Sequence, residues 1–106
     1  TGVRDYIHVS DLALAHEKAI DYLSEKNSNL ITNLATGDGY SVLEIIKRVE
    51  DLISTKIIYD VVKKREGDPA VLIASSKIAY EELGWEPHFS RIDIILDSMW
   101  NIYKEF

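Results

Sequence analysis

Cysteine is absent from this sequence. Disulfide bonds and thiolate metal sites are therefore excluded, and the three histidines, His8, His16 and His88, lack the spacing of a zinc site. We predict neither a metal site nor cysteine-based redox chemistry. The composition fits a reducing compartment.

Long apolar runs and an excess of positive charge are also missing. No apolar stretch approaches the roughly 18–20 residues that cross a bilayer, and the first residues lack the charged-then-apolar pattern of a signal peptide. The formal net charge of -6 argues against nucleic acid or an anionic membrane as partner, because cations dominate both kinds of binding. We therefore expect a cytoplasmic protein that binds neither.

The chain does contain enough apolar sequence for one small α/β domain, with 106 residues of which 46% are hydrophobic. Apolar periodicity and β-rich runs predict about four helices and three or four short strands. Helices are expected at residues 12–23, 42–53, 75–83 and 92–106, and strands at 6–9, 30–34, 57–62 and 71–73. Such scattered strands do not make a complete sheet, and the chain starts at Thr1 without methionine, so we expect part of a larger protein.

Local signals define the ends of the helices. Ser41 and Glu44 have the spacing of a capping box, which marks the start of the second helix. Ser10 or Asp11 is expected to cap the first helix through its side chain. Gly84 is expected to end the third helix in a left-handed conformation, which costs glycine little.

The most informative stretch is Lys63–Ala70, where cations, a turn glycine and a carboxylate follow an apolar run. The guanidinium of Arg65 can grip a phosphate through two parallel hydrogen bonds, and Asp68 can accept from sugar hydroxyls. This combination suits a nucleotide or a nucleotide-sugar. The alternative is a solvated surface turn, which is the commoner role of charged turns.

Three other features have two interpretations each. Arg4, next to a predicted strand, either points to solvent or reaches across a cleft to a phosphate. His8 is either a general base or a hydrogen-bonding strut in the core. The Thr36–Gly39 turn precedes a helix, but it lacks the glycine fingerprint of dinucleotide-binding loops and the lysine of a P-loop, so we interpret it as structural. Trp85 and Trp100 are expected in the core or at a domain contact.

Four sequence blocks carry a family resemblance in the order Arg4–Val9, Asn33–Val42, Arg65–Ala70 and Leu83–Trp85. Together they resemble the carboxy-terminal part of the UDP-glucose 4-epimerases, a family of extended short-chain dehydrogenases/reductases. The resemblance runs through the whole chain. It implies that residues 1–106 are a carboxy-terminal, substrate-binding domain fragment from which the Rossmann domain is absent.

The resemblance also implies the activity of the full-length parent. These enzymes use NAD to remove hydride from C4 of a UDP-hexose and return it to the other face, which interconverts UDP-glucose and UDP-galactose. In this family the NAD fingerprint and the catalytic tyrosine and lysine lie in the amino-terminal Rossmann domain, and these 106 residues contain no counterpart. The fragment is therefore expected to have no catalytic residue, to bind no NAD and to be inactive alone, and the parent is expected to be a homodimer.

Residue by residue, the resemblance places Arg4 and Arg65 on the diphosphate and Asp68 on the uridine ribose hydroxyls of a UDP-hexose. Val71 or Leu72 stands where the family has a residue that helps to decide whether an N-acetylated sugar fits. The loop before them is one residue shorter than in the tyrosine-bearing type. Ala35 replaces a common glycine, a small change expected to leave its turn intact.

Two other functions stay open. One is a sister nucleotide-sugar dehydratase or decarboxylase, which shares the fold and the arginine clamp but has different catalytic residues. The other is an isolated, non-catalytic module that binds a nucleotide-sugar or another protein. In either case, apolar surface is expected to be exposed where a Rossmann domain would pack.

Overall fold

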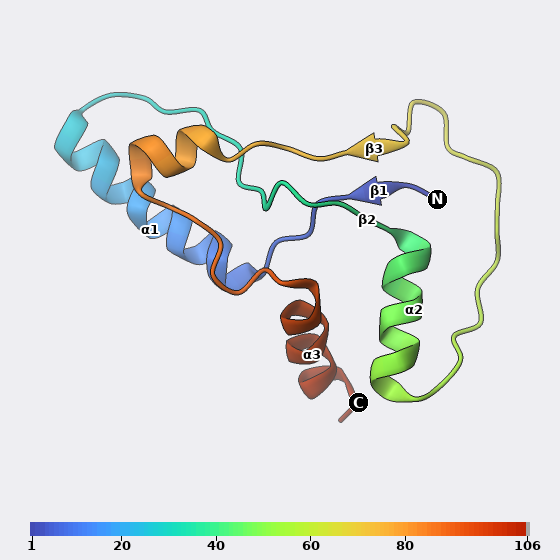
Figure 1. The fold of residues 1–106 in the computed structure, drawn as a ribbon. Coiled ribbons are helices and arrows are strands. Elements are labelled where there is room, and N and C mark those ends of the chain that lie inside the picture. The colour runs from blue at the N-terminus through green and yellow to red at the C-terminus, as the bar shows by residue number, and fades with distance from the viewer. Residues whose placement is uncertain (106) are drawn as a thin grey trace.

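Residues 1–105 are described by a computed structural model, so Phe106, which falls in the last predicted helix, lies outside the described residues. Figure 1 shows a long helix, α1, beside a short orange helix, η1, on one side of the molecule, and a three-stranded sheet with α2 below it on the other side. The α/β fold class is confirmed. No helix among the described residues is both long enough and apolar enough to span a membrane.

Helix α1 (Val9–Lys26) is capped by His8 and not by the predicted Ser10 or Asp11. The His8 ring accepts a hydrogen bond from the Ser10 N–H through Nδ1, at 3.0 Å, which satisfies one of the free donors of the first turn. The prediction that Ser10 or Asp11 caps this helix is wrong, because the helix starts earlier and takes both residues into its first turn. The predicted strand at 6–9 is wrong for the same reason, since Val9 is already helical.

Helix α2 (Val42–Ile53) has the predicted capping box. The Glu44 N–H donates to Ser41 Oγ at 3.1 Å, and the Ser41 N–H donates to the Glu44 carboxylate at 2.9 Å. Both bonds join residues three apart, so the sequence alone specifies them. The prediction is confirmed.

The sheet contains β1 (Val3–Arg4) between β2 (Tyr40–Ser41) and β3 (Val71–Leu72). β1 pairs antiparallel with β2 and parallel with β3, with Arg4 opposite Leu72 in the parallel register. Gly39 permits this close approach: a Cβ there would lie 2.5 Å from the Ile73 side chain and 2.6 Å from that of Val3. The predicted strands at 30–34 and 57–62 are wrong, because these segments pair with no strand among the described residues.

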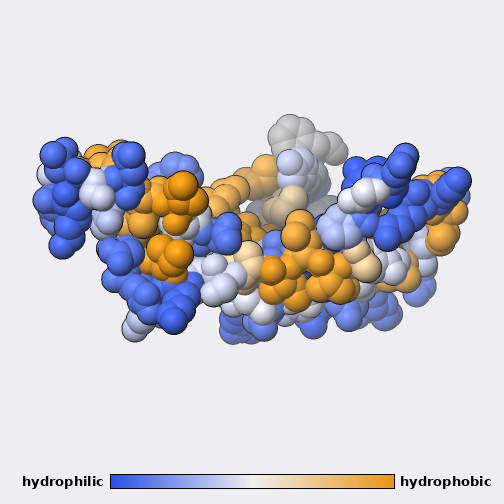
Figure 2. Space-filling view, turned by 90° about the horizontal axis from the view of Figure 1, so that it is seen from above, coloured by the Kyte–Doolittle hydropathy of each residue, from blue (hydrophilic) through white to orange (hydrophobic). Residues whose placement is uncertain are grey.

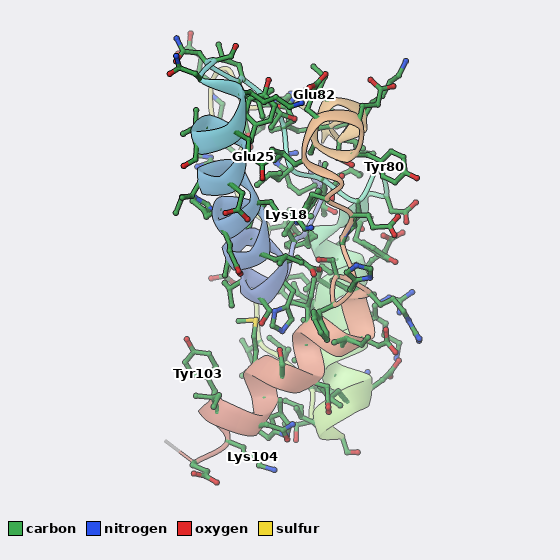
Figure 3. The ribbon with its side chains drawn as sticks, turned by 90° about the vertical axis from the view of Figure 1, so that its left-hand side faces the viewer. Lys18, Glu25, Tyr80, Glu82, Tyr103 and Lys104 are labelled. Atoms are coloured by element: carbon green, nitrogen blue, oxygen red, sulfur yellow. The ribbon has the colours of Figure 1, made fainter. Side chains whose placement is uncertain are left out.

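The third helix, predicted at 75–83, includes the π-helical element η1 (Ala79–Leu83) and ends at Gly84, whose φ of 63° confirms the left-handed stop. Figure 3 shows η1, with Tyr80 and Glu82, beside α1, with Lys18 and Glu25. Between them lies a small core of buried residues with partly buried neighbours. These are Ala15, Ala79 and Trp85, with Ile7, Leu14, Leu34 and Leu83.

The last helix, α3 (Ile92–Tyr103), contacts α2. Trp85 before it is fully buried, and its indole Nε1–H donates to the Asp11 carbonyl at 2.8 Å, so its predicted core position is confirmed. Trp100, on α3 itself, is partly exposed, so it does not belong to the core.

Candidate functional site

The candidate site starts with a tight turn. The Asp68 N–H donates to the Arg65 carbonyl at 3.2 Å, and Gly67 has a φ of 76°, which is the positive value that type II turns need at their third residue. The turn brings the side chains at its two ends together. Arg65 Nη2 lies 3.3 Å from Asp68 Oδ2.

The parallel β1–β3 pairing brings a residue from the start of the chain to this turn. The Val3 N–H donates to the Ala70 carbonyl at 2.8 Å, which places Arg4 beside the segment that follows Asp68. Arg4 Nη2 then donates to Asp68 Oδ1 at 2.8 Å, and Arg4 Nη1 donates to the Val3 carbonyl at 2.8 Å. The three residues predicted from the sequence therefore meet.

Their arrangement differs from the predicted one, in which both arginines bind a diphosphate and Asp68 binds ribose hydroxyls. The Asp68 carboxylate lies between the two guanidinium groups and binds one with each oxygen, because planar N–H groups pair with any oxyanion. Arg4 and Asp68 are half-buried, with side chains 26% and 27% exposed, whereas Arg65 is 83% exposed. Arg4 thus points to a carboxylate and not freely into solvent. Five hollows found elsewhere on the described residues are lined by other side chains than these three.

The electrostatics keep Asp68 ionised. Desolvation is the largest single influence and raises the pKa of Asp68, but the hydrogen bond and charge of Arg65, with the charge and hydrogen bond of Arg4, together outweigh it. The pKa of Asp68 is therefore lowered below its ordinary value. At neutral pH the trio carries two positive charges and one negative charge, which favours an anionic ligand.

The two candidates for the sugar-size gate lie next to this trio on β3. Val71 and Leu72 are both exposed. Because successive side chains of a strand point to opposite faces, Leu72 shares the face of its register partner Arg4, whereas Val71 shares that of Val3. Their role in sugar selection stays a prediction.

The Thr36–Gly39 turn is structural, as predicted. The Asp5 carboxylate accepts from the Thr36 N–H and the Gly37 N–H, each at 2.9 Å, and from the Thr36 hydroxyl at 2.7 Å. Ala35 before it is buried, so a small residue is required there, and the turn is intact. Since a carboxylate of the chain already uses these amide donors, the turn does not fit the pyrophosphate of NAD.

His8 is a hydrogen-bonding strut, one of its two predicted roles. Because Nδ1 accepts from the Ser10 N–H, the ring proton of the neutral form is on Nε2, which lies 3.1 Å from Ser98 Oγ. The Ser98 hydroxyl in turn donates to the Ile95 carbonyl at 2.8 Å. His8 therefore ties the start of α1 to α3.

The actual role of Asp11, which was expected to be a helix cap, was not predicted from the sequence. Asp11 is fully buried, and its carboxylate accepts from the His88 N–H at 3.0 Å, the Phe89 N–H at 2.9 Å and the Ser90 hydroxyl at 2.5 Å. Burial is the largest influence and raises the pKa of Asp11, but these bonds and the charge of His8 together lower it. Asp11 braces the loop before α3, and no sequence signal reveals this because its partners lie 77 to 79 residues away.

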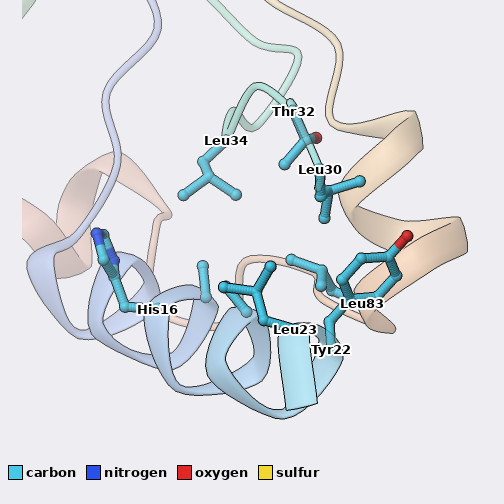
Figure 4. A pocket seen from close by; sticks show the side chains of 9 residues that line it. His16, Tyr22, Leu23, Leu30, Thr32, Leu34 and Leu83 are labelled. Atoms are coloured by element: carbon cyan, nitrogen blue, oxygen red, sulfur yellow. The ribbon is translucent and has the colours of Figure 1, made fainter. Parts of the chain in front are cut away.

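Two hollows elsewhere are poor candidates for a diphosphate. Figure 4 shows the first, of about 180 Å³, between α1, residues 30–34 and η1; its lining, which includes Tyr22, Leu23 and Leu34, contains no arginine or lysine. The second, of about 480 Å³, is lined by Arg48 and Arg91 among others. There Arg91 pairs with Asp93 at 2.8 Å and Arg48 lies over the Tyr40 ring at 5.2 Å, so both cations already have partners.

Comparison with known proteins gives the family. No protein-family model matches the chain. Over 105 residues, 99% of this chain, it is 45% identical to the UDP-glucose 4-epimerase of Homo sapiens. This chain is homologous to the carboxy-terminal part of UDP-glucose 4-epimerases. It spans about 30% of the length of the curated relatives it matches, and the resemblance predicted from the four sequence blocks is confirmed.

Solved structures of UDP-glucose 4-epimerases are similar to this chain in fold as well as in sequence. The UDP-glucose 4-epimerase from Bifidobacterium longum, in complex with NAD+ and UDP, is 40% identical with a TM-score of 0.86, and the match covers 99% of this chain and 31% of that one. The enzyme from Stenotrophomonas maltophila, with bound NAD and formylated UDP-arabinopyranose, is 37% identical with a TM-score of 0.90 and the same coverage. The fold predicted from the family is therefore present over almost the whole chain.

Proposed function

We propose that this chain is the UDP-sugar-binding part of an NAD-dependent UDP-glucose/UDP-galactose 4-epimerase, a cytoplasmic homodimer that serves galactose metabolism. One observation carries the proposal: in a chain homologous to epimerases, Arg4 meets the distant turn that carries Arg65 and Asp68, beside one small sheet. An ordinary surface salt bridge pairs one cation with one carboxylate, whereas the Asp68 carboxylate pairs with two arginines.

In the proposed complex the two guanidinium groups bind the diphosphate and Asp68 accepts from the uridine ribose hydroxyls. An arginine has several N–H donors, and the bonds to Asp68 use only some of them. The Asp68 carboxylate would therefore hold both guanidinium planes in place as well as contact the ribose. Fixing the diphosphate orients the hexose, which lowers the entropic cost of the reaction at C4.

NAD supplies the hydride chemistry in the full-length enzyme. The Thr36–Gly39 turn, which comes closest to a dinucleotide loop, has its amide donors bound to Asp5, so we assign no NAD contact to this chain. The role of these residues is to bind and orient the sugar nucleotide. By itself the fragment is expected to be inactive.

A chimera tests the proposal. Residues 1–106 would replace the matching part of the Bifidobacterium longum epimerase, and conversion of UDP-galactose to UDP-glucose would be measured with NAD. The chimera should be active, and Arg65→Lys should lower kcat/KM by about tenfold or more, because lysine cannot form the planar fork. Lys63→Ala, two residues earlier, is the matched control and should change little. A folded chimera without turnover would contradict the proposal.

The 37–45% identity to epimerases favours this activity over a sister dehydratase or decarboxylase. The same chimera separates them, because an epimerase yields only the C4 epimer. A 4-keto-deoxy or decarboxylated product would support the alternative.

The alternative, a stand-alone binding module, implies that the isolated chain binds UDP more tightly than our proposal does. Because the trio forms an open surface site, we expect the isolated chain to bind UDP with a Kd no better than about millimolar. Calorimetry on the 106-residue chain measures this directly. Micromolar binding would favour the module.

A further inference from the structure

Asp38 is followed directly by Gly39 in the turn before β2. Among residues 1–105 the Asp38 side chain forms no ion pair or hydrogen bond, and the Gly39 N–H has no acceptor. Asp38 lines the hollow of about 480 Å³ described above. A carboxyl group without a partner thus lies next to a main-chain amide that is also without one.

Solvent reaches this turn. The molecule is thin, with extents of 50 × 36 × 20 Å, and Figure 2 shows apolar side chains at several places on one face, among charged ones. Asp38 itself is exposed, and residues 38 and 39 lie in no helix or strand. Backbone without regular hydrogen bonds opens at little cost in free energy, so the turn can reach a reactive conformation.

We propose that Asp38 is a site of spontaneous isomerisation to isoaspartate. The Gly39 nitrogen attacks the side-chain carbon of the protonated Asp38 carboxyl group, an N–C bond forms, and the hydroxyl leaves as water with the amide proton. Water then adds to the former main-chain carbonyl of this five-membered imide and breaks the bond from that carbon to nitrogen. The water lost in the first step is regained in the second, so the isomerisation needs no oxidant, reductant or cofactor.

The glycine makes this aspartate more reactive than the others. A side chain on the attacking residue hinders ring closure, and glycine has none. No other aspartate of the chain precedes a glycine. Asp60 is the matched comparison: it is also exposed, outside helices and strands and without a partner among the described residues, but β-branched Val61 follows it.

The fold has no room for the product. The main chain of isoaspartate contains one more methylene group, and this group would lie between two fixed points. On one side the Gly37 N–H donates to the Asp5 carboxylate at 2.9 Å, and on the other the Val42 N–H donates to the Gly2 carbonyl at 3.2 Å. A Cβ at Gly39 would already lie 2.5 Å from a neighbouring side chain. The extra length must therefore displace β2 from β1.

Isomerisation would also act on the candidate site, a consequence that rests on the proposed function. Arg4 is the register partner of Tyr40 in β2, and it supplies one guanidinium group to the trio. Displacing β2 would shift Arg4 relative to Asp68. The new α-carboxylate also makes residue 38 a substrate for the class of repair enzymes that methylate isoaspartyl groups with S-adenosylmethionine.

Methyl transfer measures the site on the 106-residue chain. The chain is incubated for several days at neutral pH and physiological temperature, then labelled with a protein isoaspartyl methyltransferase and S-adenosylmethionine, and the labelled residue is located by mass spectrometry. Label should accumulate at residue 38 at least about tenfold faster than at Asp60. Asp38→Glu should remove it, because the longer side chain must close a six-membered ring, whereas Asp60→Glu should leave it unchanged.

Incubation in urea separates the effect of the fold from that of the sequence. Because the fold leaves the Asp38 side chain without a partner, the native rate should stay within about tenfold of the rate in urea. Label at residue 38 that appears only in urea overturns the inference, and so does equal labelling of Asp38 and Asp60.

Amide exchange tests the effect on the sheet. In the purified isoaspartyl form the Val42 amide should exchange at least about tenfold faster than in the unmodified chain, because its bond to the Gly2 carbonyl is lost. Unchanged exchange would overturn the displacement of β2.

The chimera extends the test to a complete enzyme. Label should accumulate at residue 38 there too, and labelling no faster than at Asp60 would overturn the inference for that enzyme. The label is counted whether or not the chimera turns over UDP-galactose, so failure of the proposed function and failure of this inference are distinguishable.

Discussion

Two regions of this molecule differ in where their polar and apolar groups find partners. Around α1 the buried Asp11 carboxylate is satisfied by donors of the same chain, and Trp85 fills the core beside it. Around β3, Asp68 holds two arginines at the surface, and the segment before it leaves its apolar side chains exposed. The first region stabilises the fold, and the second is where we propose that the ligand binds.

The two carboxylates make the comparison sharper. In both, burial alone would raise the pKa, and donors reverse the effect. The donors of Asp11 are backbone amides and a hydroxyl inside the fold, whereas those of Asp68 are charged groups that another anion could also attract. The same residue type thus serves stability in one place and recognition in the other.

The largest effect is expected from Asp11→Ala. Removing the carboxylate leaves the amides of His88 and Phe89 without their acceptor, which should lower the free energy of unfolding by about 3–4 kcal/mol. Urea unfolding followed by tryptophan fluorescence measures the change. Asp21→Ala, on an exposed position of the same helix, is the control and should stay within about 0.5 kcal/mol.

Gly39→Ala should have the next largest effect. Its Cβ would overlap the side chains of Ile73 and Val3, so β1 and β3 must move apart, at a cost of about 1–3 kcal/mol. The movement should also separate Arg4 from Asp68 and weaken UDP binding in the chimera. Gly2→Ala is a milder comparison, because its Cβ would meet only the flexible end of Arg4, at 3.1 Å. Equal stability of the two variants would contradict the close packing at Gly39.

Lowering the pH should disrupt the ion pairs of the Asp68 trio, with a smaller effect than either of these two substitutions. Because the folded-state pKa of Asp68 is lowered, the ion pairs persist from neutral pH down through the ordinary range of a carboxyl group, and they are lost only as pH falls through the lowered value. Carbon NMR of the carboxyl group should show a midpoint below that of a free aspartate. In Arg65→Ala the midpoint should rise, since that side chain contributes most to the lowering. An unchanged midpoint would show that Arg65 does not contact Asp68 in solution.

The smallest effect is expected from Arg65→Ala on stability. The side chain is 83% exposed, and a single exposed ion pair contributes little to folding. The unfolding midpoint of the chain should therefore be unchanged, although activity of the chimera falls. Clear destabilisation would mean that this arginine has a structural role.

Features that depend on neighbours in sequence were predictable. The capping box at Ser41, the stop at Gly84 and the turn at Gly67 each need only residues three or four apart, and all three are present. The meeting of Arg4 with Arg65 and Asp68 came instead from the family resemblance. The residues alone left Arg4 undecided between solvent and a cleft.

The wrong predictions have one physical cause. A strand requires a partner, and residues 57–62 have none among the described residues, so their β-rich composition produced no strand. Asp11 looked like a helix cap because the loop that binds its carboxylate lies far along the chain. Composition and spacing contain no information about such distant contacts.

The sequence by itself determined the helix α2, the turn before Asp68, the lack of cysteine chemistry and the kinship with epimerases, because each depends on residue identity or on short-range hydrogen bonds. Only the tertiary structure decided that Asp68 bridges both arginines, that Asp11 braces the loop before α3 and that 57–62 is left uncovered. These features arise from contacts between segments that the chain brings together only on folding.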